Sequence, residues 1–207
     1  MSAKIVLASA SPRRKELLRQ IGLDFDVIPS LAEETVLPEE TPEQLVVRLS
    51  LAKAREVAGR KEVAGRWFIG SDTIVLCDGI ILGKPEDEAH ATAMLRKLSG
   101  REHQVLSGYA VIDRESGREI AEAVSTRVRF RRLTDGEIAR YIATGEPADK
   151  AGSYAIQGLG VCFVAGIEGS YTNVVGLPLC RLTLALEELG VPTFLNEDSR
   201  FKEQGSR

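Results

Sequence analysis

RWFIGSDTIVLCDGIILGKP, residues 66–85, holds two apolar, β-branched runs that flank Asp78-Gly79. An Asp-Gly pair between such runs is a strong signal for a two-residue turn, so this stretch predicts a β-hairpin. Asp72 lies within the first run, although aspartate is disfavoured in strands and costly to bury without a partner. Such conflicts often mark function, so Asp72 is a candidate ligand of a divalent cation or a candidate general base. The equal alternative is an aspartate at a bulge or strand end that accepts backbone N–H groups.

Upstream, LASASPRRKELLRQIG, residues 7–22, is typical of a buried strand that turns into a helix. Ser11 is a suitable N-cap and Pro12 a suitable first helical residue. Arg13 and Arg14 then lie at the positive end of the helix dipole, where acidic residues are normally favoured. A bound polyanion would explain this placement, because helix N-terminal N–H groups and paired guanidinium groups both bind phosphate. Solvated surface arginines are the alternative.

Strands and helices are mixed along the rest of the chain. The patterns predict strands over 4–8, 25–30, 105–113 and around 123–130, and helices over 42–59, 86–98, 134–144 and 178–190. Capping boxes of the Thr-x-x-Gln and Thr-x-x-Glu kind begin two of the helices, at Thr41 and Thr134. Hairpins beside βαβ-like segments predict an α/β or α+β protein with a mixed sheet. The antiparallel section 102–131 is a candidate second lobe, and the glycine-rich region 150–176 is expected to hold loops and strands.

The composition fits one domain. Of the 207 residues, 43% are hydrophobic and 28% charged, which is ample for a core over 1–195, while the polar end, 196–207, is expected to be mobile. The net charge of −3 argues against a general nucleic-acid binder. No apolar run approaches the roughly 20 residues of a membrane span, and no signal-peptide pattern is present. Cys77, Cys162 and Cys180 are too scattered for a disulfide framework or zinc site, so a cytoplasmic protein is expected.

Two further stretches hold candidate ligand contacts. In GKPED, residues 83–87, Lys84 follows a strand and can reach a phosphate, whereas the two acids are better explained as caps of the next helix. In DKAGSYAIQGLG, residues 149–160, the glycines permit a close backbone approach to a ligand, and Tyr154 and Gln157 can read a base edge. A tight turn region is the favoured alternative there, because the stretch lacks both the dinucleotide fingerprint and the P-loop pattern.

The remaining charged residues favour simpler explanations. Alternation in TRVRFRR, residues 126–132, places three arginines on one strand face, which we interpret as a solvated face or a subunit contact. His90 and His103 have no serine or cysteine in a recognisable nucleophile setting, so a hydrolytic triad is not indicated. Glu33 and Glu34 lie in an acidic loop, where such residues are usually solvated unless the loop folds over Asp72.

Together, four motifs resemble those of the Maf family of nucleoside triphosphate pyrophosphatases. The motifs are S-x-S-P-R-R-x-E-L-L, S-D-T-I-V, G-K-P-x-D and D-K-A-G-x-Y-x-I-Q-G-x-G, and the likeness runs from about Lys4 to Gly190. Asp72-Thr73 and Gln157 are similar to the branch that acts on dTTP and UTP, whereas Ser71 stands where many relatives have alanine. The resemblance implies an elongated α/β fold with a central mixed sheet, flanking helices and two lobes around a cleft, similar to inosine triphosphate pyrophosphatases.

The resemblance also implies roles for individual residues. It implies a catalytic Asp72, specificity residues Arg13, Thr73 and Gln157, phosphate contacts Ser9, Arg14, Lys53 and Lys84, and a Mg²⁺ or Mn²⁺ ion held by Glu34 and Asp72. Water would attack the α-phosphorus and release pyrophosphate, and the Gln157 amide would suit a pyrimidine edge that presents O4 and N3–H. The alternatives are the same chemistry on another base, such as 7-methyl-GTP, or a nucleotide-binding regulator of cell division without turnover. A homodimer is consistent with the family.

Overall fold

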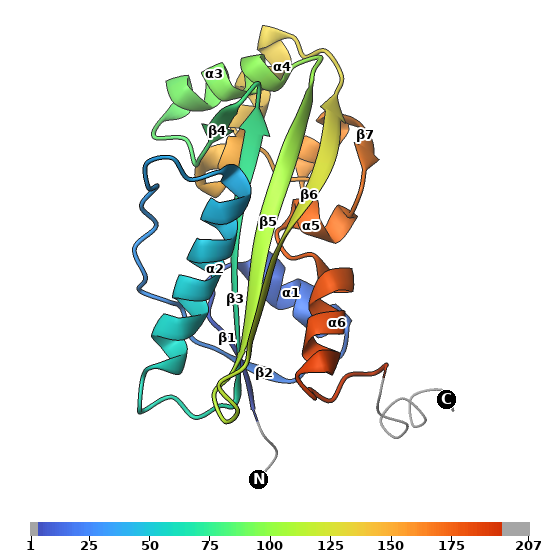
Figure 1. Cartoon of the computed structure of the whole chain (residues 1–207). Helices are drawn as coiled ribbons and strands as arrows, with labels where there is room; N and C mark the ends of the chain where they lie inside the picture. The colour runs from blue at the N-terminus through green and yellow to red at the C-terminus, as the bar shows by residue number, and fades with distance from the viewer. Residues whose placement is uncertain (1–3, 196–207) are drawn as a thin grey trace, which may run out of the picture.

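A seven-stranded sheet runs through the computed structural model, which describes residues 4–195 (Figure 1). The strands lie in the order β2-β1-β3-β5-β6-β7, and β4 pairs with β3 outside this path. Their bounds are β1 Ile5–Leu7, β2 Phe25–Val27, β3 Trp67–Cys77, β4 Ile80–Leu82, β5 Glu102–Asp113, β6 Glu119–Phe130 and β7 Val164–Glu168. β1 is parallel to both β2 and β3, whereas the other pairs are antiparallel. The predicted mixed sheet in an α/β fold is therefore confirmed.

The predicted hairpin joins β3 to β4. Asp78 and Gly79 at its turn have φ values of 52° and 75°, the positive values that a type I′ turn requires. β3, β5 and β6 are 11, 12 and 12 residues long and pair along most of their length, which gives the molecule its elongated shape in Figure 1. The antiparallel section 102–131 thus extends the central sheet, and the division into two lobes stays a prediction.

The four predicted helices after the first are present within two residues of their predicted starts, whereas α5, Tyr171–Val175, is not predicted. Their bounds are α1 Pro12–Gln20, α2 Pro42–Ala58, α3 Glu88–Leu98, α4 Asp135–Ile142, α5 Tyr171–Val175 and α6 Leu179–Glu188. Both predicted capping boxes are present, at Thr41 before α2 and at Thr134 before α4. Asp87 caps α3, where its Oδ1 accepts the His90 N–H at 2.7 Å, so the capping interpretation of this acid is confirmed.

The two faces of the sheet are covered by different helices. Val6, Phe68 and Ala110 point to the face packed by α2, whereas their neighbours Leu7 and Ile69 belong to the larger core that includes residues of α1, α3 and α6. This is the alternation that strand geometry imposes on a sheet with helices on both sides. Figure 1 shows α2 lying along one face, with α1 and α6 behind the other.

α2 lies unusually close to the sheet because two strand residues have no side chain. A Cβ at Gly70 would collide with the carbonyl oxygen of Ser50, and one at Gly108 with that of Val46. The backbone of α2 therefore rests directly on β3 and β5. This close approach brings Lys53, in the fourth turn of the helix, beside Asp72 of β3.

The glycine-rich region is more helical than the sequence predicts. The short 3₁₀ helices η2 Ala151–Ser153 and η3 Leu159–Phe163 lie in it before β7 and α5, and a third, η1 Glu146–Asp149, directly precedes it. The predicted tail, 196–207, lies outside the described residues. None of the helices within residues 4–195 is long and apolar enough to cross a membrane.

Candidate functional site

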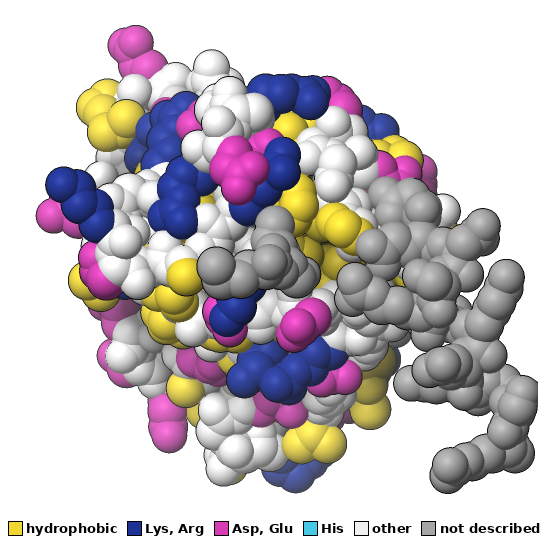
Figure 2. Space-filling model, turned by 90° about the horizontal axis from the view of Figure 1, so that it is seen from below, with side chains coloured by type: hydrophobic (Ala, Val, Ile, Leu, Met, Phe, Trp, Pro, Cys, Tyr) yellow, Lys and Arg dark blue, Asp and Glu magenta, His cyan; other side chains and the backbone are white. Residues whose placement is uncertain are grey.

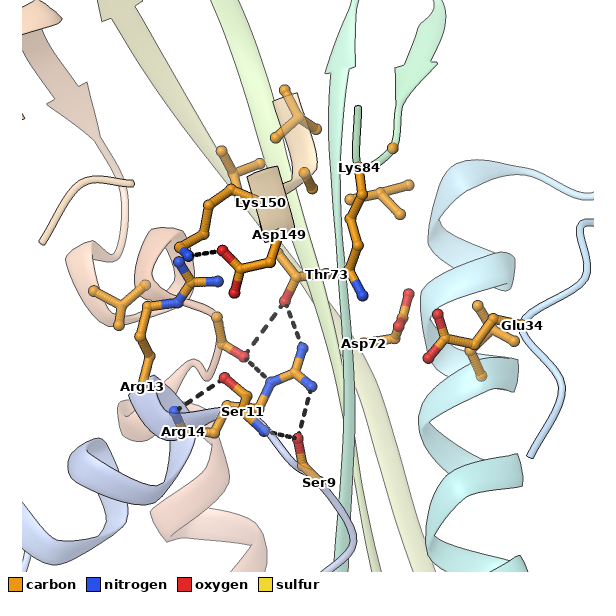
Figure 3. A pocket seen from close by; sticks show the side chains of 18 of the residues that line it. Ser9, Ser11, Arg13, Arg14, Glu34, Asp72, Thr73, Lys84, Asp149 and Lys150 are labelled. Atoms are coloured by element: carbon orange, nitrogen blue, oxygen red, sulfur yellow. Dashed lines mark hydrogen bonds and ion pairs between the residues drawn. The ribbon is translucent and has the colours of Figure 1, made fainter. Parts of the chain in front are cut away.

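A cavity of about 570 Å³ collects almost every residue that the sequence singles out. Its walls come from the N-terminus of α1, the loop that precedes α2, α2 itself, the middle of β3 and the segment 149–156 (Figure 3). The lining includes the predicted residues Ser9, Arg13, Arg14, Glu34, Lys53, Asp72, Thr73 and Lys84. Gln157 is the exception, since it is exposed and the lining stops at Ile156.

Asp72 has a buried ionic partner. Its Oδ1 accepts a hydrogen bond from Lys53 Nζ at 2.7 Å, and both residues are only 8% exposed. The backbone N–H of Asp72 donates to Ser50 Oγ at 3.0 Å, which joins β3 to α2 at the same level. A buried charge needs such compensation. Within the described residues the carboxylate thus pairs with a side chain, and its interpretation as a cap of backbone N–H groups is wrong.

Lys53 also reaches the loop before α2. Its Nζ lies 2.6 Å from Glu34 Oε1, so one ammonium joins two carboxylates that are far apart in sequence. Burial raises the pKa of Glu34, but the hydrogen bond and charge of Lys53 outweigh that effect and leave the pKa below its ordinary value. Lys53 thus contacts both carboxylates, and its predicted contact with phosphate stays a prediction.

Arg14 is held by three parts of the chain. Its Nε donates to the Gly176 carbonyl oxygen at 2.8 Å, Nη1 to Ser9 Oγ at 3.2 Å and Nη2 to Thr73 Oγ1 at 3.0 Å (Figure 3). Burial lowers the pKa of this guanidinium, while Asp72 opposes the shift. Two of its five N–H groups remain for a ligand. The side chain is consequently fixed in place with one part directed to the cavity.

Arg13 extends to the opposite wall. Figure 3 shows its guanidinium beside Asp149 and Lys150, which form an ion pair with each other. Burial lowers the pKa of Arg13, and the charge of Asp149 opposes that shift. Its Nε is buried and has no hydrogen-bond partner within residues 4–195. A buried donor without a partner suits a ligand that supplies an acceptor.

The charge of the cavity favours an anion. Its cations are Arg13, Arg14, Lys53, Lys84 and Lys150, against the carboxylates Glu34, Asp72 and Asp149. Lys84 is exposed at the mouth, and Figure 3 shows its amine directed toward Glu34 and Asp72. An excess of positive charge in a concave site concentrates anionic ligands. The surface seen in Figure 2, by contrast, intermingles basic and acidic side chains.

The arginine-rich strand face does not resemble a ligand site. Arg127 pairs with Glu168, and Arg131 pairs with Glu137 at 2.8 Å. These pairs are exposed, and they neutralise the cations that a nucleic-acid backbone would require. They support the interpretation of residues 126–132 as a solvated face.

The glycines of the segment 149–160 approach the protein and not the cavity. A Cβ at Gly158 would collide with the Glu146 carboxylate, and one at Gly160 would come within 2.8 Å of the Tyr141 hydroxyl. These two glycines therefore permit tight packing within the protein, and the prediction that they admit a ligand is wrong. Tyr154 does line the cavity, and its hydroxyl lies 2.9 Å from Nε2 of the buried His103.

Three contributors were missed by the sequence reasoning. Asp149 and Lys150 are visible in the DKAG motif but had no assigned role, and both line the cavity. The carbonyl of Gly176, which follows α5, accepts from Arg14 and from Ser71 Oγ at 3.2 Å. Its φ of 123° favours glycine, but a backbone carbonyl leaves no mark in a sequence.

The carboxylates can hold a divalent cation. Within the described residues no three His, Cys, Asp or Glu side chains form a metal-binding cluster. Mg²⁺, however, needs only one or two protein carboxylates when substrate phosphates complete its shell. Glu34 and Asp72 converge on one ammonium and use only Oε1 and Oδ1 for it, so each keeps a second oxygen for a cation. The donor set therefore fits Mg²⁺ or Mn²⁺.

Comparison with known proteins gives consistent matches over most of the chain. The family model described as "Maf-like protein" matches residues 4–189. A dTTP/UTP pyrophosphatase of Syntrophotalea carbinolica is 64% identical, over 94% of this chain and 88% of that protein. Proteins of the same name from Geotalea uraniireducens and Moorella thermoacetica are 55% and 50% identical, over 92% and 91% of this chain and 98% and 96% of theirs. A solved structure, protein VC0702 from Vibrio cholerae, matches with a TM-score of 0.35 at 12% identity, over 70% of this chain and 79% of that chain, which is too weak to carry an argument.

Proposed function

This chain belongs to the Maf family, and on that premise we propose that it is a nucleoside triphosphate pyrophosphatase that acts on dTTP and UTP. The observation that carries the proposal is one cavity in which the Asp72–Lys53–Glu34 cluster faces the arginine-bearing start of α1. A triphosphate needs cations along its length and a base for water at its α-phosphorus. The cavity offers both within one space.

The basic side chains would bind the triphosphate. Arg13, the two unused N–H groups of Arg14, and Lys84 can donate charge-assisted hydrogen bonds to phosphate oxygens. Because Arg14 is already held by three protein acceptors, little side-chain entropy is lost when it binds. Most of the rate enhancement would come from positioning and from stabilisation of charge on the leaving pyrophosphate.

Asp72 would act on the attacking water. Its carboxylate accepts the water proton as the water oxygen bonds to the α-phosphorus, and the bond between that phosphorus and the bridging oxygen breaks to release pyrophosphate. Lys53 holds one carboxylate oxygen at 2.7 Å, so the second oxygen is the one that meets either the water directly or the cation that orients it. A Mg²⁺ or Mn²⁺ ion held by Glu34 and Asp72 would supply further neutralisation of phosphate charge.

The preference for pyrimidines rests on the relatives' names and on two residues. Thr73 lines the cavity, and its hydroxyl lies 3.0 Å from Arg14 Nη2. Gln157 is exposed one position beyond the lining, so its role in base recognition stays a prediction. A homodimer and a cytoplasmic location likewise stay expectations, drawn from the family and from the composition.

Pyrophosphate release from a panel of nucleoside triphosphates tests the proposal. With Mg²⁺ or Mn²⁺ present, we expect dTTP and UTP to be hydrolysed fastest, and Asp72→Asn to lower kcat by about 10² to 10⁴, the range for loss of a general base. Asp26→Asn is the matched control, because Asp26 is an exposed aspartate on β2 whose one ion pair within residues 4–195 is with Lys4. Faster turnover of 7-methyl-GTP would overturn the pyrimidine preference. If the protein bound nucleotides but hydrolysed none of them, the proposal of an enzyme would give way to that of a nucleotide-binding regulator.

A further inference from the structure

Glu146, in η1, lies outside the cavity but is bonded to the segment that forms one of its walls. Its carboxylate accepts the backbone N–H of Leu159 at 2.9 Å, the N–H of Gly160 at 3.1 Å and the hydroxyl of Tyr141 at 2.8 Å. Successive backbone N–H groups of this kind form a concave anion site. Here the anion is a side chain of the protein, so the interaction fixes the loop and is not available to a ligand.

The same carboxylate reaches the cavity wall through Tyr141. The Tyr141 hydroxyl accepts the N–H of Ala155 at 3.1 Å, so its own proton must go to Glu146. Tyr141 is 4% exposed and stands on α4, a helix with a complete capping box. Glu146 is thus connected to both ends of the segment 155–160.

The packing around this carboxylate is tight. Any side chain at Gly158 would collide with Glu146, and one at Gly160 would press on Tyr141 and on the Ala155 carbonyl oxygen. Burial raises the pKa of Glu146, but the two backbone N–H groups and the Tyr141 hydroxyl together hold it below the ordinary value. The group is therefore an anion at neutral pH, which strengthens each bond that it accepts.

The wall that Glu146 supports contributes part of the apolar lining. Tyr154, Ala155 and Ile156 line the cavity there, while Leu45, Ile74 and Ile81 are among the other apolar residues of the lining. Apolar side chains give no bond to phosphate, so the triphosphate belongs with the arginines and lysines. Residues 154–156 supply apolar lining on the same segment as Asp149 and Lys150, so a nucleobase bound next to the triphosphate would face them.

We propose that Glu146 is a positioning residue, which acts through Tyr141 and the backbone of residues 155–160 to hold the wall that selects the nucleobase. The inference rests on the proposed hydrolysis of nucleoside triphosphates at this cavity. Glu146 touches neither substrate nor reacting atoms. Its loss therefore weakens nucleotide binding and lowers the selectivity between nucleobases more than it slows the chemical step.

Steady-state kinetics with UTP and GTP on three variants test this role. Glu146→Gln keeps the size of the side chain but places an NH₂ group against backbone donors, and Tyr141→Phe removes only the shared hydroxyl. We expect Glu146→Gln to raise KM for UTP about tenfold while kcat stays within about twofold of wild type. We also expect it to lower the ratio of kcat/KM for UTP to kcat/KM for GTP. Tyr141→Phe should change KM and this ratio in the same direction but less. Because the two residues share a hydrogen bond, the double variant should lose less than the product of the single losses.

Glu137→Gln is the matched control. Glu137 lies on α4, accepts the backbone N–H of Thr134 at 2.8 Å and pairs with Arg131, and within residues 4–195 none of its hydrogen bonds or ion pairs involves the segment 155–160. It should leave KM and the nucleotide ratio within twofold of wild type. Amide hydrogen exchange at Ala155, Leu159 and Gly160 should accelerate in Glu146→Gln and not in Glu137→Gln.

Two results would overturn the proposal. Faster exchange with an unchanged KM and ratio would mean that the segment does not meet the nucleotide, and a fall in kcat alone would place Glu146 in the chemical step. Should the wild type hydrolyse no nucleotide, the proposed function fails, and calorimetric binding of UTP to the same variants tests the positioning role separately. There, a dissociation constant about tenfold higher in Glu146→Gln supports the role, and an equal one overturns it.

Discussion

At the scale of single residues, Lys53 is the side chain on which the site depends most. It places one ammonium 2.6 Å from Glu34 and 2.7 Å from Asp72, with 10% of its own side chain exposed. The pair of Lys53 and Asp72 is buried, whereas the Glu34 side chain is 55% exposed. The two ion pairs of Lys53 therefore contribute unequally to stability. Water screens the Glu34 contact strongly and the Asp72 contact little.

Replacing Lys53 tests that difference. Lys53→Met keeps the length of the side chain but leaves Asp72 as a buried charge without its partner, so we expect a loss of about 3 kcal/mol in the free energy of unfolding at pH 7. Urea unfolding measures it. Lys84→Met removes an exposed cation of the same cavity and should cost less than about 0.5 kcal/mol. The double variant Lys53→Met/Asp72→Asn should recover part of the loss; a loss equal to that of Lys53→Met alone would refute the unpaired charge as its cause.

The residue scale also marks the limit of sequence reasoning about the site. Asp72 stands out in the sequence because aspartate conflicts with a strand. Arg13 and Arg14 stand out because cations conflict with the dipole at a helix N-terminus. Each of these residues breaks a local rule. The partners that resolve these conflicts are not local. Arg14 donates to Gly176, 162 positions away, and Asp72 is paired with a lysine on a different element. A sequence shows the unsatisfied group but not the group that satisfies it.

At the scale of elements, the site depends on how closely α2 approaches the sheet. Gly108 of β5 pairs with Asp72 of β3, and the carbonyl of Val46 occupies the space that a side chain at Gly108 would need. Ser50 Oγ, one turn farther along α2, accepts the Asp72 N–H at 3.0 Å. The contact of helix and sheet and the placement of the carboxylate are thus one feature of the fold.

Gly108→Ala tests whether the close packing of α2 on the sheet, and not the backbone freedom of glycine, is what the position requires. The added methyl group must push α2 outward, so we expect a loss of about 3 kcal/mol in the free energy of unfolding and a parallel fall in kcat as Lys53 moves from Asp72. Thermal unfolding and pyrophosphate release measure the two effects. Gly136→Ala, in the first turn of α4, has room for a Cβ at 3.4 Å from Arg140 and should be neutral within about 1 kcal/mol. Equal effects of the two substitutions would contradict the steric explanation.

The elements themselves were predicted unevenly, for a physical reason. α2 and α4 were found because their capping boxes are local signals, and the β3–β4 turn because Asp78-Gly79 is one. Over 146–176 the sequence does not predict η1, η2, η3 or α5, since these helices are too short for helical periodicity and depend on partners such as Glu146. Local signals predict where elements begin, whereas packing decides what short segments become.

At the scale of the whole molecule, burial of one histidine couples folding to pH. His103 is 2% exposed and packs against Phe130 and Tyr154, with ring centroids 5.0 and 5.5 Å away. Its Nε2 lies 2.9 Å from the Tyr154 hydroxyl, while its buried Nδ1 has no partner within residues 4–195. Burial lowers the pKa of His103 to about 4 from an ordinary value of 6.5. Folding therefore requires the neutral ring.

The sign of the resulting pH dependence follows from that order of pKa values. The unfolded chain binds a proton at His103 as the pH falls below 6.5, whereas the folded protein does not do so until about pH 4, so stability is lost as the pH falls between these values. Between pH 7 and pH 5 the loss should be about 2 kcal/mol, and it should be absent in His103→Gln. Urea unfolding at pH 7, 6 and 5 compares the slopes of the wild type and His103→Gln. Above pH 5 most carboxylates are still ionised, so a wild-type slope in His103→Gln would mean that the buried ring does not control acid stability.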